Sequence, residues 1–353
     1  MTTTVSVSQM TAAVLRGREL VSIERVEVPE IGRDEVLVRV KVATTCGTDL
    51  KVWRQGYHEK MIRPPAFFGH ELSGVIEKLG PEVPKRFHVG MRVVPANSAP
   101  CHACFYCRKD QPNLCEDLLF NNGAYAEFIR IPGRIVRENL LEMPDHVSFA
   151  DASLVEPLAC VLRGIDETNV RPGDTVILIG CGPLGLMFVR LLTLRGANVI
   201  AVAKRANQAE VAARLGARMT FLSEELTDPI AEVRRYAGNG RGADAVIEAV
   251  GSPVTWEWAM GMVRRGGSVN LFGGCPRGTR IEIDPTALHY SEITIKSSFH
   301  HTPRFVREAL DTIARGQIRS RDYVSEKVPL ADLPKLFEQM KNRKSQMKVA
   351  VIP

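Results

Sequence analysis

Hydrophobic and polar residues alternate along several short runs within residues 1–150. Glycine or proline separates these runs, and an alternating pattern bounded by such residues is typical of β-strands. Because the runs are short and unevenly spaced, we expect an irregular, mostly antiparallel β domain. The runs cover residues 11–17, 19–29, 35–45, 72–80 and 90–95.

From Asp174 onward the pattern changes to apolar runs that alternate with helical segments. In the helical segments, apolar residues recur every three or four positions, as on one face of a helix. Strands that alternate with helices predict a parallel, doubly wound sheet. The expected strands lie at 175–180, 198–203, 244–250, 268–274 and 293–299, and the expected helices at 183–196, 208–217 and 255–266, with an earlier helix within 152–168.

The end of the chain predicts a helix at 304–318, a turn and helix at 327–344, and a strand at 348–353. We expect this tail to pack back onto the first domain. The predicted fold class is therefore α/β, with a doubly wound parallel sheet inserted in a mostly antiparallel β domain. The expected boundaries are 1–156 for the β domain, 157–296 for the doubly wound domain and 297–353 for the return segment.

The composition is that of a globular protein: 353 residues, 45% hydrophobic and 24% charged. The net charge of +6 is spread along the chain, which favours a solvated surface over a nucleic-acid interface. No run approaches the ~18 apolar residues of a membrane span, and the small polar residues at 1–10 suggest a frayed start without a secretion signal. We expect a cytoplasmic protein with neither a nucleic-acid nor a membrane partner.

A glycine-rich segment, Gly180-Cys181-Gly182-Pro183-Leu184-Gly185, fits the pattern G-x-G-x-x-G. It follows a predicted strand and opens a predicted helix, which is the context that dinucleotide binding requires. The first glycine permits a tight turn, the second lets the backbone approach the pyrophosphate, and the third lets helix and sheet pack closely. The helix N-terminus then offers N–H groups to the phosphates. The alternative is an ordinary strand-turn-helix with incidental glycines. The expected cofactor-binding residues here are Gly180, Gly182, Pro183, Leu184 and Gly185.

The residues after the second predicted strand of this domain bear on the choice of cofactor. A free ribose 2′-hydroxyl is usually bound by an acidic side chain at this point, but the sequence has Lys204 and Arg205. Two cations suit a 2′-phosphate better than a diol. We therefore predict a preference for NADP over NAD, the alternative being a solvated basic turn.

Four of the eight cysteines lie close together, at Cys101, Cys104, Cys107 and Cys115. Four thiolates at this spacing can close a tetrahedral zinc site that leaves no open position, and the surrounding residues are loop-like. We expect a structural zinc; an iron–sulfur cluster and a disulfide pair are the alternatives. His102 lies within this run but is expected to be a bystander, because four cysteines already fill the coordination shell.

A second set of possible metal ligands is dispersed along the chain: Cys46, His70, Glu71 and Glu156. Singly, each has an ordinary structural explanation, such as an acidic residue at a helix start. Together they offer a thiolate, an imidazole and one or two carboxylates, which is a catalytic zinc set with room for water or substrate.

Several motifs together make the chain resemble the zinc-dependent medium-chain dehydrogenase/reductase superfamily. The resemblance covers nearly the whole chain and is strongest to the polyol branch typified by sorbitol dehydrogenase, with threonine dehydrogenase close by. It implies a GroES-like catalytic domain with a zinc lobe at 100–116, a Rossmann domain, and a homodimer or homotetramer. The motifs are CGTD at 46–49, GHE at 69–71, the four cysteines, VEPLA at 155–159, GCGPLG at 180–185 and the glycine pair at 273–274.

The resemblance also implies roles for individual residues. Cys46, His70 and either Glu71 or Glu156 would hold the catalytic zinc. Thr48 matches the hydroxyl that hydrogen-bonds the reacting alcohol and begins the proton relay. The implied reaction moves a hydride between a secondary alcohol (a polyol, cyclitol or sugar) and NAD(P), giving a ketone.

The sequence departs from the family pattern at two positions. Lys51 replaces the usual relay histidine, for which His58 is a possible substitute, and His300 stands roughly where the polyol branch has a substrate-contacting arginine. Phe120 and His300 are the expected substrate contacts. Phe120 and Trp53 are each a candidate pocket wall or a core residue.

Two other functions fit parts of the sequence. One is a dehydrogenase that resembles threonine dehydrogenase or acts on a simple alcohol. The other is a non-catalytic protein that binds zinc and a dinucleotide and recognises nucleic acid or another partner. The catalytic type of ligand set argues against the second, because such ligands have no evident use without chemistry.

Overall fold

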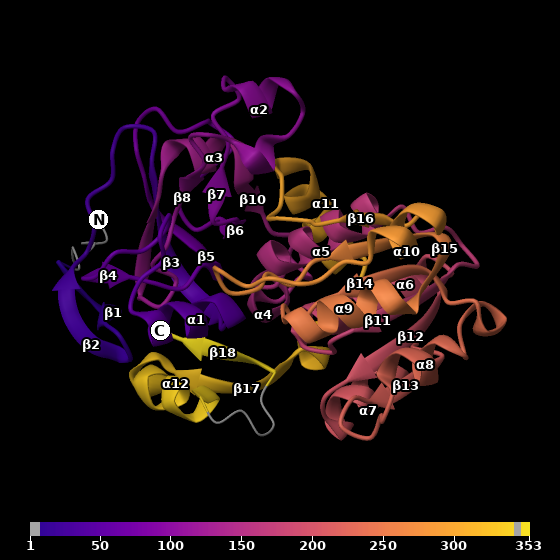
Figure 1. Ribbon diagram of the computed structural model, residues 1–353. Coiled ribbons are helices and arrows are strands. Elements are labelled where there is room, and N and C mark those ends of the chain that lie inside the picture. The colour runs from indigo at the N-terminus through magenta and orange to yellow at the C-terminus, as the bar shows by residue number, and fades with distance from the viewer. Residues whose placement is uncertain (1–7, 342–346) are drawn as a thin grey trace. The chain divides into compact units, whose positions relative to one another are not determined.

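The computed structural model describes residues 8–341 and 347–353 (Figure 1). The chain divides into two compact units. The first unit combines Met1–Pro157 with Thr302–Pro353, and the second unit is Leu158–His301. The first unit therefore consists of two separate stretches of the chain, whereas the second is continuous.

The main sheet of the first unit has the strand order β10-β6-β5-β3-β18-β17, with β9 also paired to β3. All its pairings are antiparallel except that of β17 with β18. Thr44, at the end of β3, lies opposite Glu71 on β5 and Ala350 on β18, so three distant segments meet there. The strands are β3 (Val36–Thr44), β5 (Glu71–Leu79), β6 (Arg92–Pro95), β9 (Phe128–Ile131), β10 (Leu140–Glu142), β17 (Val324–Pro329) and β18 (Lys348–Ile352).

A second sheet of the first unit has the order β2-β1-β4. Strands β7 and β8 form a separate two-stranded sheet. Trp53, on α1, is 1% exposed and its ring centroid lies 5.7 Å from that of Phe337 on α12. Trp53 is therefore a core residue rather than a pocket wall. The remaining elements are β1 (Gln9–Gly17), β2 (Leu20–Glu27), β4 (Ala66–Phe67), β7 (Ser98–Ala99), β8 (Leu119–Phe120), α1 (Gly47–Gln55), α2 (Phe105–Arg108), α3 (Gly133–Asn139), α4 (Phe149–Ala152), α11 (Pro303–Ala314) and α12 (Leu333–Lys341).

The second unit holds a parallel sheet with the order β13-β12-β11-β14-β15-β16. In chain order this is 3-2-1-4-5-6, the arrangement of a Rossmann fold. Helix α6 packs on β11 and β12 and contacts α7, while α9 packs on β14 and β15 and contacts α8 (Figure 1). The elements are β11 (Thr175–Ile179), β12 (Asn198–Ala203), β13 (Met219–Leu222), β14 (Ala243–Glu248), β15 (Val263–Leu271), β16 (Thr294–Lys296), α6 (Pro183–Leu194), α7 (Ala206–Arg214), α8 (Pro229–Arg234), α9 (Pro253–Met262) and α10 (Pro285–Tyr290), with α5 (Val155–Thr168) beginning just before the unit.

The predicted fold class is confirmed, and most predicted strands and helices are present. Two segments differ. The expected turn at 327–332 is in part the end of β17, because this segment pairs with β18. The expected helix at 255–266 ends at Met262, and β15 begins with a bulge in which Gly266 adopts a positive φ of 66°. The expected frayed start and the last residues of the helix at 327–344 lie in part outside the described residues.

Within the described residues, no helix is both long and apolar enough to cross a membrane.

Candidate active site and metal centres

Cys46 occupies the N-cap of α1, directly after the end of β3. The backbone N–H of Cys46 donates to Oδ2 of Asp49 at 2.9 Å, and the N–H of Thr48 donates to the Cys46 sulfur at 3.4 Å. This reciprocal arrangement is a capping box in which cysteine takes the usual place of serine or threonine. It fixes the sulfur at the N-terminal end of the helix.

His70 and Glu71 lie at the start of β5, after Gly69 with its φ of 85°. The ligand atoms of Cys46, His70 and Glu71 all lie within 4.8 Å of one another. Atoms bound to one zinc at about 2.0 to 2.3 Å lie within roughly 4.5 Å of each other, so these three side chains fit a shared ion with small adjustments.

His70 is oriented by Asp49, a buried residue that sequence reasoning did not assign a role. The Nδ1 atom of His70 lies 3.1 Å from Oδ1 of Asp49. Burial lowers the pKa of His70, but the carboxylate of Asp49 and the sulfur of Cys46 outweigh it and raise that pKa well above its ordinary value. With Nδ1 facing Asp49, Nε2 is the nitrogen that remains for a metal. The capping-box spacing between residues 46 and 49 was the signal that could have identified Asp49.

Glu71 forms a buried ion pair with Lys348. Its two carboxylate oxygens both contact Nζ of Lys348, one of them at 2.6 Å, and Oε2 also accepts from Oγ1 of Thr44 at 2.5 Å. Nζ of Lys348 donates as well to the carbonyl of Thr45 at 3.0 Å. Burial lowers the pKa of Lys348, but Glu71 and Cys46 together raise it above its ordinary value. No sequence signal pointed to Lys348, because it lies 277 positions from Glu71.

Glu156 lies in the first turn of α5 and is 7% exposed. Its carboxylate is not part of the cluster formed by Cys46, His70 and Glu71. Burial raises the pKa of Glu156 to about 7, and the charges of His70 and Glu71 act on it in opposite directions. The structure thus brings Glu71 to Cys46 and His70 while leaving Glu156 within electrostatic reach.

The other residues expected in the catalytic region differ in exposure and in the element that carries them. Thr48 is half-buried on α1, and Lys51, on the same helix, is exposed. His58 lies in a short bridge with Ile62, and burial lowers its pKa. Phe120 is half-buried on β8 of the first unit. His300 belongs to the second unit, where it adopts a φ of 66°.

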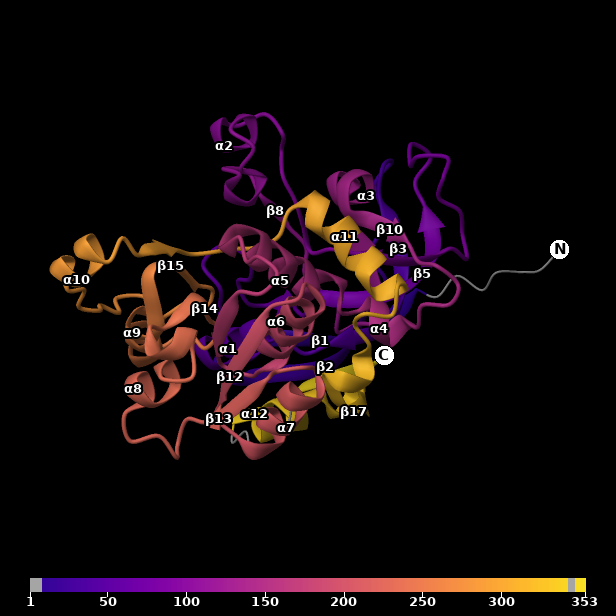
Figure 2. The same cartoon turned by 90° about the vertical axis from the view of Figure 1, so that its right-hand side faces the viewer.

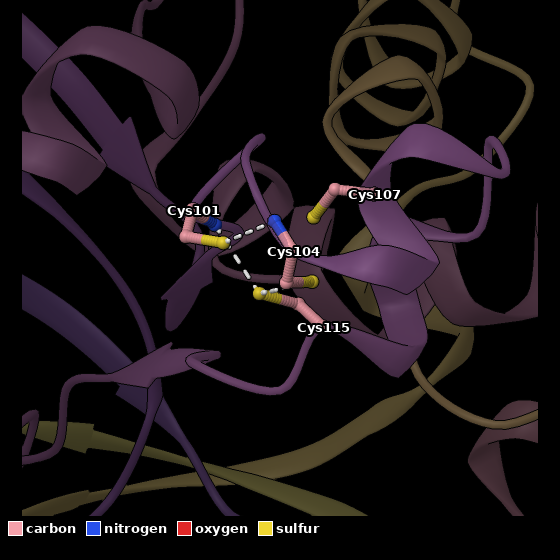
Figure 3. A group of neighbouring side chains, drawn as sticks. All are labelled: Cys101, Cys104, Cys107 and Cys115. Carbon is pink, nitrogen blue, oxygen red and sulfur yellow. Dashed lines mark hydrogen bonds between the residues drawn. The ribbon is translucent and has the colours of Figure 1, made fainter.

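The four sulfurs of Cys101, Cys104, Cys107 and Cys115 converge (Figure 3). Those of Cys104 and Cys115 are 3.9 Å apart, close to the ~3.8 Å between two thiolates on one tetrahedral zinc with bonds near 2.3 Å. Hydrogen bonds from backbone N–H groups lower the pKa of Cys104 to about 6, whereas burial raises that of Cys107 to about 12. All eight cysteines are free, so a disulfide does not form here.

The loop that carries these cysteines and α2 projects from the first unit (Figure 2). Helix α3 anchors it through two contacts. Arg134 donates to the carbonyl of Asp117 at 2.7 Å and to its carboxylate at 2.8 Å. Nε2 of His102 lies 3.1 Å from the carboxylate of Glu138. His102 therefore links the lobe to α3 and is not a fifth ligand of the four-cysteine site.

The glycine-rich loop has the geometry that its three glycines predict. Gly180 has a φ of 102°, and a Cβ on Gly185 would lie 1.8 Å from the carbonyl oxygen of Gly180. A Cβ on Gly182 would meet no atom within 4 Å. Helix α6 begins at Pro183, the residue after Gly182. The turn is thus tight at the first glycine, open at the second and closely packed at the third.

Lys204 and Arg205 follow β12, at the carboxyl edge of the parallel sheet. Arg205 is the N-cap of α7, and Lys204 is exposed, with Nζ 4.0 Å from a carboxylate oxygen of Glu224. In open parallel sheets, ligands bind at this edge, next to the strand that precedes the glycine-rich loop.

Comparison with known proteins agrees with this geometry. Residues 32–145 match the alcohol dehydrogenase GroES-like domain, and residues 183–315 match the zinc-binding dehydrogenase domain. D-arabinitol dehydrogenase 1 of Uromyces fabae is 31% identical, with 98% of each chain covered. Sorbitol dehydrogenase of Bacillus subtilis (strain 168) is 29% identical over 98% of this chain and 97% of that one. A candidate zinc-binding dehydrogenase of Sinorhizobium meliloti 1021, with NADP bound in its crystal structure, has a TM-score of 0.89, 29% identity, and coverage of 98% and 100%.

The chain therefore belongs to the zinc-binding dehydrogenase family. The family resemblance predicted from the sequence is confirmed, and with it the class of protein: a zinc-dependent oxidoreductase that uses NAD(P) and acts on alcohols.

Proposed function

We propose that this enzyme oxidises a secondary alcohol of the polyol, cyclitol or sugar type to a ketone. The observation that carries the proposal is the convergence of Cys46, His70 and Glu71 within 4.8 Å, in a chain that also has an open glycine-rich turn. The first unit would act as the catalytic domain, and the second unit would bind the dinucleotide. The names of relatives that act on D-arabinitol and sorbitol support a polyol substrate.

Cys46 and His70 would hold the catalytic zinc, with either Glu71 or Glu156 as the third protein ligand. Glu71 lies at ligand distance, but Lys348 and Thr44 already bind both of its oxygens. Replacing Glu156 by Gln should therefore weaken zinc binding at this site more than replacing Glu71. The opposite order would assign Glu71 as the ligand. The four cysteines at 101, 104, 107 and 115 would hold the structural zinc.

When bound, zinc would act as a Lewis acid that acidifies the alcohol, and the nicotinamide would carry the hydride. Thr48 would hydrogen-bond the reacting hydroxyl and pass its proton toward solvent. The open backbone at Gly182 would let the pyrophosphate approach the first turn of α6, with Gly180, Pro183, Leu184 and Gly185 shaping that turn. Phe120 and His300 would contact the substrate.

We infer a preference for NADP from Lys204 and Arg205. Neither is acidic, so the end of β12 offers cations where a ribose diol would need a carboxylate. The S. meliloti relative with bound NADP supports this choice. Comparing kcat/KM for the two cofactors tests it: the ratio should favour NADP in the wild type and fall in Arg205→Ala.

We further propose a cytoplasmic homodimer or homotetramer. Among the described strands, β16 forms one edge of the parallel sheet, and an edge strand can pair with another copy. Light scattering at several concentrations measures the assembly directly, and a monomer at all of them would contradict it.

The decisive experiment is an absorbance screen of polyols, cyclitols and sugars with both cofactors, combined with metal analysis. The two proposed zinc sites, one at Cys46 and His70 and one at the four cysteines, predict two zinc ions per chain. Cys46→Ala should abolish turnover and leave one zinc, at the four cysteines. Full activity in that variant would overturn the proposed site.

A further inference from the structure

Tyr125 lies completely buried, directly against the segment that carries His70. Its backbone N–H donates to the carbonyl of Phe68 at 3.2 Å, and the N–H of Ala124 donates to that of Gly69 at 3.1 Å. A Cβ on Gly69 would lie 2.6 Å from the Tyr125 ring, so the ring packs on the bare backbone of the residue before His70. Its neighbour Phe68 meets it edge-on, with centroids 5.1 Å apart.

The hydroxyl of Tyr125 reaches the carboxylate that orients His70. It donates to Oδ2 of Asp49 at 2.6 Å, whereas the carbonyl of Thr44 lies farther away, at 3.3 Å. The same Oδ2 accepts the backbone N–H of Cys46, and Oδ1 faces Nδ1 of His70. Asp49 therefore accepts two hydrogen bonds, from Tyr125 and from the backbone of Cys46, on the oxygen that does not face His70.

We propose that Tyr125 is a positioning residue of the catalytic metal site, acting through Asp49 on both His70 and the Cys46 turn. A carboxylate can rotate about its last bond, and the Cys46 N–H alone restricts that rotation less than the Cys46 N–H and the Tyr125 hydroxyl together. By fixing Oδ2, the Tyr125 hydroxyl fixes the direction in which Oδ1 meets His70, and so the direction of Nε2. This inference rests on the proposed catalytic zinc at Cys46 and His70.

Tyr125→Phe is the direct test, because it removes one oxygen and keeps the ring that packs on Gly69 and Phe68. Loss of a group in the outer shell of a metal typically costs 10- to 100-fold in metal affinity. We expect zinc at the Cys46 site to bind about 10-fold more weakly, as measured by competition with a chromogenic chelator. Zinc at the four cysteines should be unaffected. Cobalt(II) in the catalytic site should give a visible spectrum that is shifted relative to that of the wild type. The variant should lower kcat by a larger factor than it changes KM.

Tyr323→Phe is the matched control, since Tyr323 is an equally buried tyrosine of the same unit. It should keep the zinc affinity and cobalt spectrum of the wild type. Asp49→Asn should reproduce the Tyr125→Phe effect or exceed it.

The outcomes separate this inference from the proposed function. If the wild type holds zinc only at the four cysteines, the proposed catalytic site fails. If the wild type holds both ions and Tyr125→Phe keeps its zinc affinity and cobalt spectrum, the role of Tyr125 is overturned. Equal weakening of both zinc sites, with a lower melting temperature, would mean a general structural role and would also overturn it.

Discussion

Lys348 and Glu71 form an ion pair in which the side chains are 2% and 0% exposed. Removing one partner of such a pair leaves an uncompensated charge in the interior, which typically costs 3 to 5 kcal/mol. We expect Lys348→Met to lower the free energy of unfolding by about that amount. Urea denaturation followed by fluorescence measures it. The double variant Lys348→Met with Glu71→Gln should recover a substantial part of the lost free energy of unfolding, because no unpaired charge then remains buried.

Lys341 provides the matched control for this prediction. It forms an ion pair with Glu19 at the same kind of distance, 2.7 Å, but the two side chains are 39% and 33% exposed. Exposed pairs contribute about 0 to 1 kcal/mol, so Lys341→Met should change the free energy of unfolding by no more than about 1 kcal/mol. Equal effects at the two lysines would contradict the argument that burial determines the cost.

These residues also mark what the sequence could reveal at the scale of single side chains. Cys46 and His70 were predicted because each lies in a short motif whose residue types suit zinc. Lys348 and Tyr125 were not, because each acts through a neighbour far away in the chain. Lys348 reaches Glu71 only because β18 pairs with β3, and no local pattern encodes that pairing.

At the scale of elements, the turn between β11 and α6 contains two glycines that are needed for different reasons. A Cβ at Gly185 would collide with the carbonyl of Gly180, whereas one at Gly182 would meet no protein atom within 4 Å. We expect Gly185→Ala to lower stability by roughly 1 to 3 kcal/mol or more, as overpacking does. Gly182→Ala should melt like the wild type but bind NADPH at least 10-fold more weakly, because its methyl group takes the space the pyrophosphate needs.

Thermal melting and NADPH titration of both variants check this pair of expectations. A Gly182→Ala protein with unchanged affinity would place the dinucleotide away from this turn. A Gly185→Ala protein with an unchanged melting temperature would mean that the turn relaxes easily.

Helix α4 and the turn at Ser320–Asp322 are joined by Asp151, which links the two chain segments of the first unit. Its carboxylate accepts the N–H of Ser320 at 2.5 Å and the hydroxyl of Ser148 at 2.8 Å. Burial raises the pKa of Asp151, but these hydrogen bonds and Arg319 outweigh it, so the pKa in the folded state is below its ordinary value. The stabilisation is therefore present above the unfolded-state pKa, near 3.9, and is lost as the pH falls through the lower folded-state pKa.

Asp151→Asn should accordingly destabilise the protein at pH 7 by about 1 to 2 kcal/mol. The difference in melting temperature between the variant and the wild type should begin to shrink below about pH 4, where the carboxyl is protonated in the unfolded state, and should shrink further as the pH falls through the lower folded-state pKa. Comparing the two proteins at each pH cancels the effect of zinc loss, which both share. A difference that stays constant from pH 7 to pH 3.5 would count against this linkage.

Local pattern predicted the elements well where they bury a continuous apolar face, as β11, β12 and α6 do. It failed where tertiary pairing overrides local preference. The segment before Pro329 reads as a turn but extends as β17 because β18 lies beside it. Likewise β15 begins at Val263, ahead of the expected 268, because a bulge at Gly266 lets Val263 pair with Ala243.

At the scale of the whole molecule, the order of segments along the chain has consequences for folding. The second unit is one continuous stretch with its own apolar core of residues such as Ile177, Val246 and Val269. The first unit needs both chain ends, since β18 lies beside β3 at the centre of its sheet. Without residues 302–353, β3 would lose a neighbouring strand and Glu71 would be buried without Lys348.

We therefore expect the two units to differ when produced as fragments. A fragment of residues 153–301, which keeps α5 whole, should melt cooperatively and bind NADPH, because its sheet and core are complete. A fragment of residues 1–157 should not melt cooperatively until residues 302–353 are joined to it through a flexible linker. Its unpaired strand and uncompensated carboxylate each oppose folding. Calorimetry of the three fragments measures this directly, and a cooperative transition in residues 1–157 alone would mean that the N-terminal segment carries enough of the core to fold without the return of the chain.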